Sequence, residues 1–457
     1  MSKGANMKIV IIGGGPGGYV AALSAVQMGA NVCLIEKEHF GGTCVNRGCI
    51  PTKALLKAIY PLVEAKRYQS MGIDMSSVSF NLDKIRSHSQ KSAQLSRQGI
   101  EYLLKKREVK LIKGEVIDGN SQEVLVKLNS GEEFFESYDQ LIIATGSYPA
   151  QIPGLPFDRD KIISSDEALL IRKIPENMLI IGGGVIGIEM ATIYQNLGSK
   201  VTIVEMMPQL LPGEDPETVQ ILSQILMKNG IQLWMGQKIE KVETGVETCT
   251  VCLNKDNTLT QEEFEQILLA VGRKPQYPLK LIESLGIKLS PSGIEVNGFM
   301  QTNIENVYAI GDVNGSSLLA HTAFKEAKIA CEHIMGKPCS PMDYSLVPRV
   351  VYSIPEFAAI GDSAGSTAYT FPYAANGRAR AGNIREGMIK LFVSEGCIKA
   401  CSIIGENASD IIGLANMAIS KKIPLSQMEE IILAHPTYSE VFTDVIEVAL
   451  GKPIHLA

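Results

Sequence analysis

Two cysteines separated by four residues are the pair in this sequence best suited to redox chemistry. Cys44 and Cys49 stand in the run Gly41–Lys53, which reads GGTCVNRGCIPTK. In an ideal helix their side chains would lie about 140° apart, so a bond between them requires a distorted first turn. Gly48 could allow that distortion, and Pro51 would be tolerated near a helix start. A disulfide closing so short a loop adds little stability, so we expect it to serve local chemistry rather than fold stability.

The position of the pair beside an expected helix start also bears on its reactivity. A helix N-terminus favours a thiolate, so we expect a cysteine of lowered pKa here. The alternative is that Cys44 and Cys49 are two unrelated buried thiols. The chain has nine cysteines in all, an odd and scattered set. Such a set fits buried thiols in a reducing cytosol better than a disulfide framework.

The other close cysteine pairs carry no comparable signal. Cys249 and Cys252 are expected on opposite faces of a strand over residues 248–253. Cys397 and Cys401 are expected to flank a hairpin. Neither pair has a neighbouring histidine at the spacing of zinc ligands, and we expect no metal site.

The elements that must position Cys44 and Cys49 begin with a glycine-rich turn near the N-terminus. A short apolar run of strand type, Lys8–Ile12, leads directly into the glycine-rich segment Gly13–Gly18. Residues Tyr19–Met28 are then predicted as a helix, and Val32–Ile35 as a second strand that ends at Glu36. This is a G-x-G-x-x-G fingerprint in a β-α-β context, with an acid about twenty residues on.

The same pattern returns in the middle of the chain. The apolar run Met178–Ile181 leads into Gly182–Gly187, followed by a predicted helix to Leu197. A second predicted strand, Val201–Val204, ends at Glu205. One such motif could be an ordinary glycine-rich turn, but two complete copies favour two dinucleotide sites.

Each glycine of these motifs has a physical purpose at a dinucleotide site. The first permits a tight turn, the second lets the backbone approach a pyrophosphate, and the third lets helix pack on strand. The acid can accept hydrogen bonds from a ribose diol. Two identical nicotinamides would be chemically pointless, so one site is expected to bind FAD and the other a nicotinamide nucleotide. Glu205 would repel a 2′-phosphate, and Met206, Met207 and Pro208 supply no arginine, so NAD is favoured over NADP.

Length and composition agree with a multidomain globular protein. With 457 residues, roughly three or four domains are expected. The net charge of −6 gives no support to nucleic-acid binding. The most apolar stretch, Met178–Ala191, is short and is interrupted by Glu189, so no membrane span is expected. The run Ile9–Ile12 is too brief for a signal peptide, which favours a cytoplasmic protein.

The glycine and cysteine motifs together resemble one known family. Gly13–Ala22 and the run GGTCVNRGCIPTKALL from Gly41 resemble the pyridine nucleotide-disulfide oxidoreductases, in their lipoamide-specific branch. The resemblance runs over essentially the whole chain. It implies an α/β fold with two Rossmann-like dinucleotide-binding domains and a C-terminal α+β dimerisation domain. The implied boundaries are an FAD domain at 1–148, an NAD domain at 149–275, a central domain completing the FAD site at 276–344 and a dimerisation domain at 345–457.

Further motifs carry the resemblance along the chain. Ala144–Ser147 and Ala270–Arg273 resemble the two crossings between the flavin and NAD domains, and Thr302–Asp312 resembles the second flavin motif. The residues implied for FAD are Gly13, Gly15, Gly18, Glu36, Gly42, Thr43, Lys53, Val116, Thr145, Gly146, Asp312 and Ala320. Those implied for NAD are Gly182, Gly184, Gly187, Glu189, Glu205, Ile239 and Gly272.

One of the six histidines stands out by its neighbours. His435 lies five residues before Glu440, with Pro436 between them. By itself this arrangement is more often an ordinary loop histidine. The resemblance implies an acid–base pair that serves the disulfide of the partner subunit, which makes a homodimer necessary for activity. Of the others, His39, His88, His333 and His455 are expected at the surface, and His321 beside the flavin through its backbone.

The resemblance also implies how the parts cooperate. Cys44 would face the dithiol substrate and Cys49 the flavin, and Lys53 would pair with Glu189. The implied reaction is the FAD-dependent oxidation of protein-bound dihydrolipoamide to lipoamide with reduction of NAD. Two departures from the family are visible: Leu433 stands where a second histidine is common, and the segment after Gly361 is short.

The alternatives are related reductases and a non-catalytic flavoprotein. A glutathione-type enzyme should carry arginines near Glu205, and a mercuric reductase should end in vicinal cysteines. A redox-sensing flavoprotein without turnover would not need Cys44, Cys49 and His435 together. Because no lipoyl segment stands before the first strand, the substrate is expected on another protein. That partner would be the lipoyl domain of a 2-oxoacid dehydrogenase acyltransferase or a glycine-cleavage carrier protein, with no nucleic acid and no membrane involved.

Overall fold

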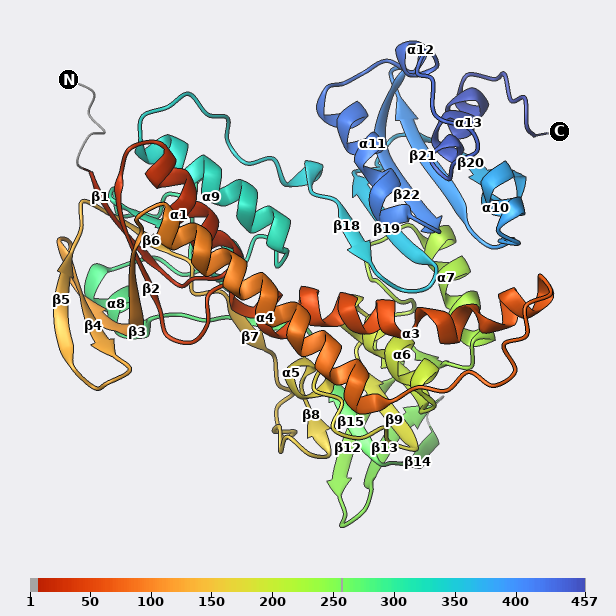
Figure 1. The fold of residues 1–457 in the computed structure, drawn as a ribbon, viewed down its shortest axis with the longest axis horizontal. Helices are drawn as coiled ribbons and strands as arrows, with labels where there is room; N and C mark the ends of the chain where they lie inside the picture. The colour runs from red at the N-terminus through yellow and green to blue at the C-terminus, as the bar shows by residue number, and fades with distance from the viewer. Residues whose placement is uncertain (1–6, 256–257, 457) are drawn as a thin grey trace. The chain divides into compact units, whose positions relative to one another are not determined.

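The computed structural model describes residues 7–255 and 258–456 and contains the helices and strands labelled in Figure 1. Residues 1–6, where the expected first domain begins, lie outside the described part. The chain forms two compact units, which are described separately below. The first contains Met1–Ala54, Leu82–Ala150 and Gly272–Tyr344, and the second contains Leu55–Asn81, Gln151–Val271 and Ser345–Ala457.

The first unit is built on a seven-stranded sheet of order β17-β6-β1-β2-β3-β4-β5. The strands from β17 to β3 pair in parallel, and β3, β4 and β5 continue as an antiparallel meander. The bounds are β1 Lys8–Ile12, β2 Asn31–Glu36, β3 Lys110–Gly119, β4 Glu123–Leu128, β5 Glu133–Ser137, β6 Gln140–Ile143 and β17 Val307–Ala309. β1, β2, β6 and β17 are mostly apolar, and their side chains belong to two buried clusters, one with α1 and α9 and the other with α8 and β4.

Two helices of the first unit lie side by side, α1 and α9 (Figure 1). The buried residues of α1 include the small residues Gly17, Ala21 and Ala25. A two-stranded ribbon of β7 and β16 marks where the chain leaves and re-enters the unit. The bounds are α1 Pro16–Gln27, α2 Gly42–Arg47, α4 Leu82–Lys106, α8 Leu279–Leu285, η1 Gly311–Asn314, α9 Ala320–Ile334, β7 Ser147–Pro149 and β16 Arg273–Pro275. Helix α3, Cys49–Ser70, begins in the first unit, and its residues from Leu55 on belong to the second.

The second unit contains a second parallel sheet, of order β11-β10-β9-β15-β8. Its bounds are β8 Ile162–Ile163, β9 Asn177–Ile181, β10 Lys200–Glu205, β11 Gln232–Met235 and β15 Gln266–Leu269, with helices α5 Ser165–Ala168, α6 Val185–Leu197 and α7 Pro216–Lys228. A three-stranded antiparallel sheet follows, with β12 Lys238–Thr244, β13 Cys249–Lys255 and β14 Thr258–Phe264. Cys249 is buried on β13 and Cys252 is only half-buried, as expected for opposite faces.

The C-terminal part of the second unit is an antiparallel sheet of order β18-β19-β22-β21-β20. Its strands are β18 Arg349–Val351, β19 Glu356–Gly361, β20 Thr367–Pro372, β21 Met388–Ser394 and β22 Cys397–Gly405. They are accompanied by η2 Tyr344–Leu346, η3 Tyr373–Ala375, α10 Gly377–Ala381, α11 Ala408–Ser420, α12 Leu425–Met428 and α13 Glu440–Ala449. One apolar core joins this sheet to α11 and α13. The predicted fold class, two Rossmann-like domains and a C-terminal α+β domain, is therefore confirmed.

Two expectations about the C-terminal part need correction or refinement. Cys397 and Cys401 do not flank a hairpin, because both lie on β22 and the turn is made by Glu395 and Gly396 just before it. The segment after Gly361 is short, as expected: β20 begins at Thr367, and residues 362–366 form no helix. Among the helices of the described residues, none is long and apolar enough to cross a membrane.

Candidate active site

The first fingerprint has the geometry that its glycines predict. Gly13 has a φ of +100°, and a Cβ there would lie 2.3 Å from the carbonyl oxygen of Ala144. A Cβ on Gly18 would lie 1.8 Å from the carbonyl oxygen of Gly13, so α1 can approach β1 only without a side chain. The nearest atom to a Cβ on Gly15 is the Cα of Gly42, at 3.8 Å. The first and third glycines are thus required by packing, whereas the second lines open space.

The second fingerprint repeats this geometry. Gly182 has a φ of +113°, and its Cβ would lie 2.4 Å from the carbonyl oxygen of Ala270. A Cβ on Gly187 would lie 2.1 Å from the carbonyl oxygen of Gly182. Around Gly184, no atom of the described residues lies within 4 Å of such a Cβ. Both turns therefore leave the same position free for a ligand.

The acids at the strand ends hold the glycine turns in place. Oε2 of Glu36 accepts a hydrogen bond of 2.6 Å from the backbone N–H of Gly14. Oε2 of Glu205 accepts one of 2.8 Å from Gly183 N–H, and its Oε1 accepts one of 2.9 Å from Met207 N–H. The sequence predicted these carboxylates as ribose ligands only, and their bonds to the turns are an additional role.

Both fingerprint helices begin with an open positive end. The N-cap residues of α1 and α6 are Gly15 and Gly184, which have no side chain that could cap the helix. Neither helix has an acidic residue in its first turn. Unpaired N–H groups and the helix dipole favour an anion at such ends, so both accommodate a pyrophosphate.

Asp312 lies at the end of a polar chain that the sequence indicated only in part. Ser147 Oγ donates a hydrogen bond of 2.5 Å to Oδ2 of Asp312, and it accepts one of 2.8 Å from Nε of Arg273. Burial raises the pKa of the Asp312 carboxyl, although Ser147 and Arg273 act against this. The Asp312 carboxyl group is thus shielded from water and accepts a hydrogen bond from Ser147, as expected of a ligand-binding carboxylate.

Glu326 is a further residue of this region that the sequence analysis missed. It is fully buried on α9, and its Oε2 accepts a 2.6 Å hydrogen bond from the N–H of Gly311, next to Asp312. Tyr344 donates a 2.7 Å hydrogen bond to Oε1. Burial raises the pKa of Glu326, and these hydrogen bonds oppose the shift. A helical glutamate of this kind has no local signal that distinguishes it from a surface residue.

Residues at the two crossings form hydrogen bonds with one another. Thr145 Oγ1 donates to the carbonyl oxygen of Gln276, and Gln276 N–H donates to the carbonyl oxygen of Gly146 at 2.8 Å. The carbonyl oxygen of Gly272 accepts a 3.0 Å bond from Ala150 N–H. Gly146 and Gly272 both have positive φ, which explains the glycines. Gly272 belongs to the first unit, whereas Gly182–Gly187 belong to the second.

The remaining nucleotide-site candidates are distributed over both units. Val116 is buried on β3, so only its backbone could meet a ligand. Thr43 lies in the first turn of α2, and Ala320 is the first residue of α9. Ile239 lies half-buried on β12 in the second unit.

The cysteine pair lies across a helix break. Cys44 is in α2, Cys49 begins α3, and Gly48 separates the two helices, which is the distortion that the spacing required. Both cysteines are present as thiols, and a hydrogen bond joins them. This hydrogen bond and burial raise the pKa of the Cys44 thiol, while Lys53 acts in the opposite direction. The lowered pKa that was expected of a cysteine at this helix start is therefore not found for Cys44.

Lys53 and Glu189 belong to different compact units. Glu189 is 4% exposed on α6, and its Oε1 accepts a hydrogen bond of 3.1 Å from the N–H of Tyr352. Lys53 lies on α3, one turn after Cys49. The Lys53–Glu189 pair is still a prediction.

The structure brings His435 and Glu440 together. Nδ1 of His435 lies 2.8 Å from Oε1 of Glu440, and Oε2 accepts a 2.7 Å hydrogen bond from Thr437 N–H. Glu440 begins α13, where the helix dipole favours its charge. The imidazole is 77% exposed, so Nε2 can reach a group outside this chain's C-terminal part. Asn376 Nδ2 supports the loop by donating to the carbonyl oxygen of Thr437 at 3.1 Å.

The expected surface position is confirmed for His39, His88 and His455, whereas the contact of His321 with the flavin is still a prediction. His39, His88, His321 and His455 are exposed. His333 is an exception, because it is half-buried, stacks on Phe299 and lies 2.9 Å from the hydroxyl of Tyr308. A surface position is therefore wrong for His333, which α9 turns toward an aromatic neighbour.

Comparisons with known proteins agree with this geometry. Residues 7–327 match the family described as pyridine nucleotide-disulphide oxidoreductase, and residues 347–446 match its dimerisation domain. Dihydrolipoyl dehydrogenase of Bacillus subtilis is 36% identical over 98% of this chain and 100% of its own length, and that of Geobacillus stearothermophilus is 37% identical over 98% and 97%.

Solved structures show the same fold over nearly the whole chain. LpdA of Mycobacterium tuberculosis superposes with a TM-score of 0.91 at 25% identity, covering 97% of this chain and 99% of that one. The HOCl-induced flavoprotein disulfide reductase RclA of Escherichia coli has a TM-score of 0.84 at 24% identity, covering 96% and 99%, and supports the fold alone. The chain therefore belongs to the pyridine nucleotide-disulphide oxidoreductase family.

Proposed function

We propose that this protein is an FAD-dependent enzyme that oxidises protein-bound dihydrolipoamide to lipoamide and reduces NAD. The observation that carries this is the contact between the dithiol helix and the first fingerprint. Gly42, the first residue of α2, lies against Gly15 so closely that a Cβ on Gly42 would be 2.6 Å from the Cα of Gly15. Cys44 follows two residues later. A redox dithiol next to a dinucleotide turn suits electron transfer between the two.

The residues present fit both cofactors. For FAD these are the turn Gly13–Gly18, Glu36, and Asp312 with its supporting hydrogen bonds. For NAD they are the turn Gly182–Gly187 and Glu205. When bound, FAD supplies two-electron chemistry that connects a dithiol with a nicotinamide.

The dithiol exchange uses residues of this chain. His435 takes a proton from one substrate thiol, and the resulting thiolate attacks Sγ of Cys44 in the oxidised enzyme. The Cys44–Cys49 bond breaks, giving a mixed disulfide with Cys44 and a thiolate on Cys49. The second substrate thiol passes its proton to Cys44 as it attacks the substrate sulfur of the mixed disulfide, which closes lipoamide and releases Cys44 as a thiol. Two electrons have passed to the enzyme, which is left with Cys44 as a thiol, Cys49 as a thiolate and the first proton on His435.

The proposal includes a homodimer and a protein substrate. The match of residues 347–446 to a dimerisation domain supports a two-fold dimer. The strong exposure of His435, 77%, is suited to a base that serves the Cys44–Cys49 pair of the other subunit. A lipoyl domain of a 2-oxoacid dehydrogenase acyltransferase, or a glycine-cleavage carrier protein, would present the dithiol. A cytoplasmic location and the division at residues 148, 275 and 344 are parts of the same proposal.

One set of assays tests substrate and cofactor together. Purified FAD-loaded enzyme is given dihydrolipoamide or reduced glutathione, each with NAD or NADP. Turnover is expected with dihydrolipoamide and NAD, with a preference for NAD of about a hundredfold because Glu205 repels a 2′-phosphate. NADP-linked glutathione turnover would overturn the proposal. A pure dimer that binds FAD but shows no dihydrolipoamide-dependent NAD reduction would instead favour the redox-sensing alternative.

A further inference from the structure

The segment that follows Glu205 bridges the second fingerprint and the C-terminal sheet. Its middle lies on the fingerprint: Leu211 N–H donates a 3.0 Å hydrogen bond to the carbonyl oxygen of Gly183. Leu210 is fully buried, and a Cβ on Gly183 would lie 2.7 Å from its Cδ2. Any movement of this segment therefore changes the environment of the glycine turn.

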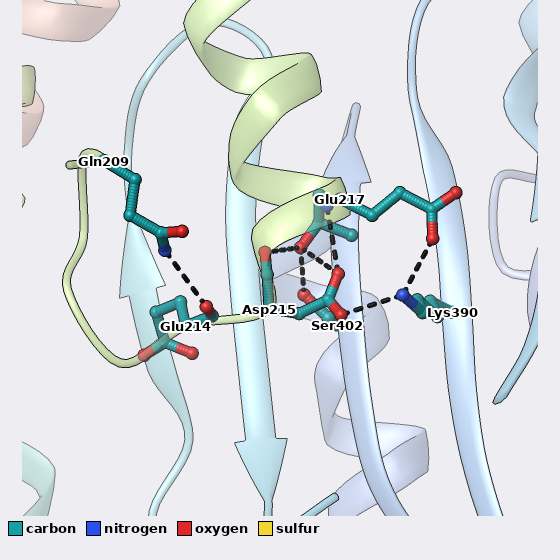
Figure 2. A network of polar contacts seen from close by, with 7 residues as sticks. Gln209, Glu214, Asp215, Glu217, Lys390 and Ser402 are labelled. Atoms are coloured by element: carbon teal, nitrogen blue, oxygen red, sulfur yellow. Dashed lines mark hydrogen bonds and ion pairs between the residues drawn. The ribbon is translucent and has the colours of Figure 1, made fainter. Parts of the chain in front are cut away.

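The far end of the segment is fixed by a lysine of the C-terminal sheet. Nζ of Lys390, on β21, lies 2.8 Å from Oδ1 of Asp215 and 2.7 Å from Oε2 of Glu217, as Figure 2 shows. Lys390 is only 9% exposed. Asp215 is also the N-cap of α7, where its Oδ2 accepts a 3.0 Å hydrogen bond from Thr218 N–H. One buried cation thus holds both the segment's end and the start of α7.

Two further contacts hold the same junction. The hydroxyls of Thr218 and Ser402 lie 2.8 Å apart, and both residues are buried. Arg349, on β18, binds the carboxylate of Glu214 through Nε and through a second nitrogen at 3.0 Å. Gln209 Nε2 donates a 3.2 Å bond to the carbonyl oxygen of Glu214, which closes the segment on itself.

Loss of Lys390 would leave charges without a partner at this junction. Burial lowers the pKa of Lys390, but Asp215 and Glu217 raise it more, and the pKa of Asp215 is lowered in turn against its own burial. Removing the cation leaves Asp215 largely buried beside a second carboxylate, Glu217, without a partner of opposite charge. Removing one partner of a buried pair is strongly unfavourable. The segment's end would move away from β21 to reach water.

We infer that Lys390 is a positioning residue for the nicotinamide nucleotide. Through Asp215 it holds the segment 206–215 against Gly183, so that the C-terminal sheet sets the NAD affinity of the second fingerprint. This inference rests on the proposed function, because it requires NAD to bind at Gly182–Gly187. Lys390 itself does not touch the nucleotide turn and acts only through the segment.

The experiment measures NAD binding by calorimetric titration of the oxidised, FAD-loaded dimer, together with steady-state kinetics. Lys390→Met is expected to raise both the Kd and the KM for NAD about tenfold, or ~1.4 kcal/mol. The KM for dihydrolipoamide should stay within about twofold of the parent value, because the variant changes the binding of NAD and not the stabilisation of the transition state. Lys390→Arg, which keeps the charge, should restore most of the affinity.

Lys452→Met is the matched control. Lys452 binds Glu429 at 2.9 Å in the same C-terminal part, but it is 62% exposed and does not contact the segment 206–215. It should leave NAD binding unchanged. If Lys390→Met does not fold, Glu217→Gln takes its place. This variant removes the charge of one of the two carboxylates that bind Lys390, at a side chain that is 57% exposed. The Kd for NAD is then expected to rise roughly twofold.

The outcomes separate the two proposals. An unchanged Kd for NAD in Lys390→Met, even with a lowered melting temperature, overturns the positioning role and leaves the proposed function intact. The same holds for an unchanged Kd in Glu217→Gln when Lys390→Met cannot be prepared. A parent enzyme that binds no NAD at all overturns both. A raised Kd that Lys390→Arg reverses supports the inference.

Discussion

Alanine at the second and at the third glycine of the NAD fingerprint should fail in different ways. Gly187 lies inside α6, where the new Cβ would be 2.1 Å from the carbonyl oxygen of Gly182. Gly184 has a φ of −81°, which any residue adopts, and no atom of the described chain lies within 4 Å of its Cβ. Gly187→Ala should therefore weaken the fold, and Gly184→Ala should weaken NAD binding alone.

The magnitudes follow from these environments. At Gly187, alanine gains ~1 kcal/mol of helix propensity. Overpacking against a backbone atom, which cannot rotate away, costs ~1–3 kcal/mol. A net loss of up to about 2 kcal/mol is expected, which lowers the melting temperature by ~2–4 °C per kcal/mol. At Gly184, the lower entropy of the unfolded chain adds ~0.4–1 kcal/mol of stability. The methyl group enters the space at the start of α6 that a pyrophosphate needs, so the affinity for NAD should fall at least about tenfold, or ~1.4 kcal/mol.

The assay combines thermal unfolding of the FAD-loaded enzyme with calorimetric titration of NAD. Gly413→Ala is the control, because Gly413 also lies inside a helix, α11, but has open space around its Cβ within the described structure. It should raise stability slightly and leave NAD binding unchanged. The reasoning is refuted if Gly184→Ala binds NAD like the parent, or if Gly187→Ala is as stable as Gly413→Ala.

Four further outcomes are expected. Glu440→Gln should lower turnover of dihydrolipoamide about a hundredfold or more while NADH still reduces the bound flavin, and normal turnover would remove Glu440 from the acid–base pair. Cys44→Ser should retain FAD but lose dihydrolipoamide oxidation, so residual activity near that of the parent would contradict the exchange steps. Phe442→Ala, at a 1% exposed core position, should cost ~3–5 kcal/mol in guanidinium unfolding, and a loss below ~1 kcal/mol would contradict the core assignment. The folded pKa of Asp215 is lowered, so the stability that Lys390 adds through it is present above the unfolded pKa of ~3.9 and is lost as pH falls through the folded value. The stability gap between parent and Lys390→Met should thus close below about pH 4 and stay open at neutral pH.

The parts of the fold that local sequence patterns determine were predictable. β1 occupies Lys8–Ile12 as predicted, because a short run of apolar residues before a glycine turn is typical of a buried parallel strand. α1 begins at Pro16, three residues before the predicted Tyr19, since proline is well suited to the first turn. The break at Gly48 followed from the spacing of two cysteines. In each case a few neighbouring residues carry the whole signal.

Contacts between distant residues were not predictable. Glu326 binds Gly311 from another element, and Lys390 binds Asp215 across 175 positions of sequence. Neither Glu326 nor Lys390 stands in a motif, and a lysine or glutamate with ordinary neighbours is expected at the surface. The hairpin error at Cys397 has a different origin: the turn residues Glu395 and Gly396 lie just before the cysteine, so the boundary was misplaced by a few residues.

The two fingerprints show how one backbone turn acquires two functions. Each turn has three consecutive glycines, and the middle one, Gly14 or Gly183, is packed against an apolar side chain. That side chain is Phe40 for Gly14 and Leu210 for Gly183. What differs is the chain beyond that side chain. After Phe40 the chain makes α2, which carries Cys44 to the first turn. After Leu210 it makes the segment that ends at Asp215 and Lys390. The turn itself therefore specifies only a dinucleotide, and the segment that closes over it decides whether the site exchanges electrons with a dithiol or responds to the C-terminal sheet.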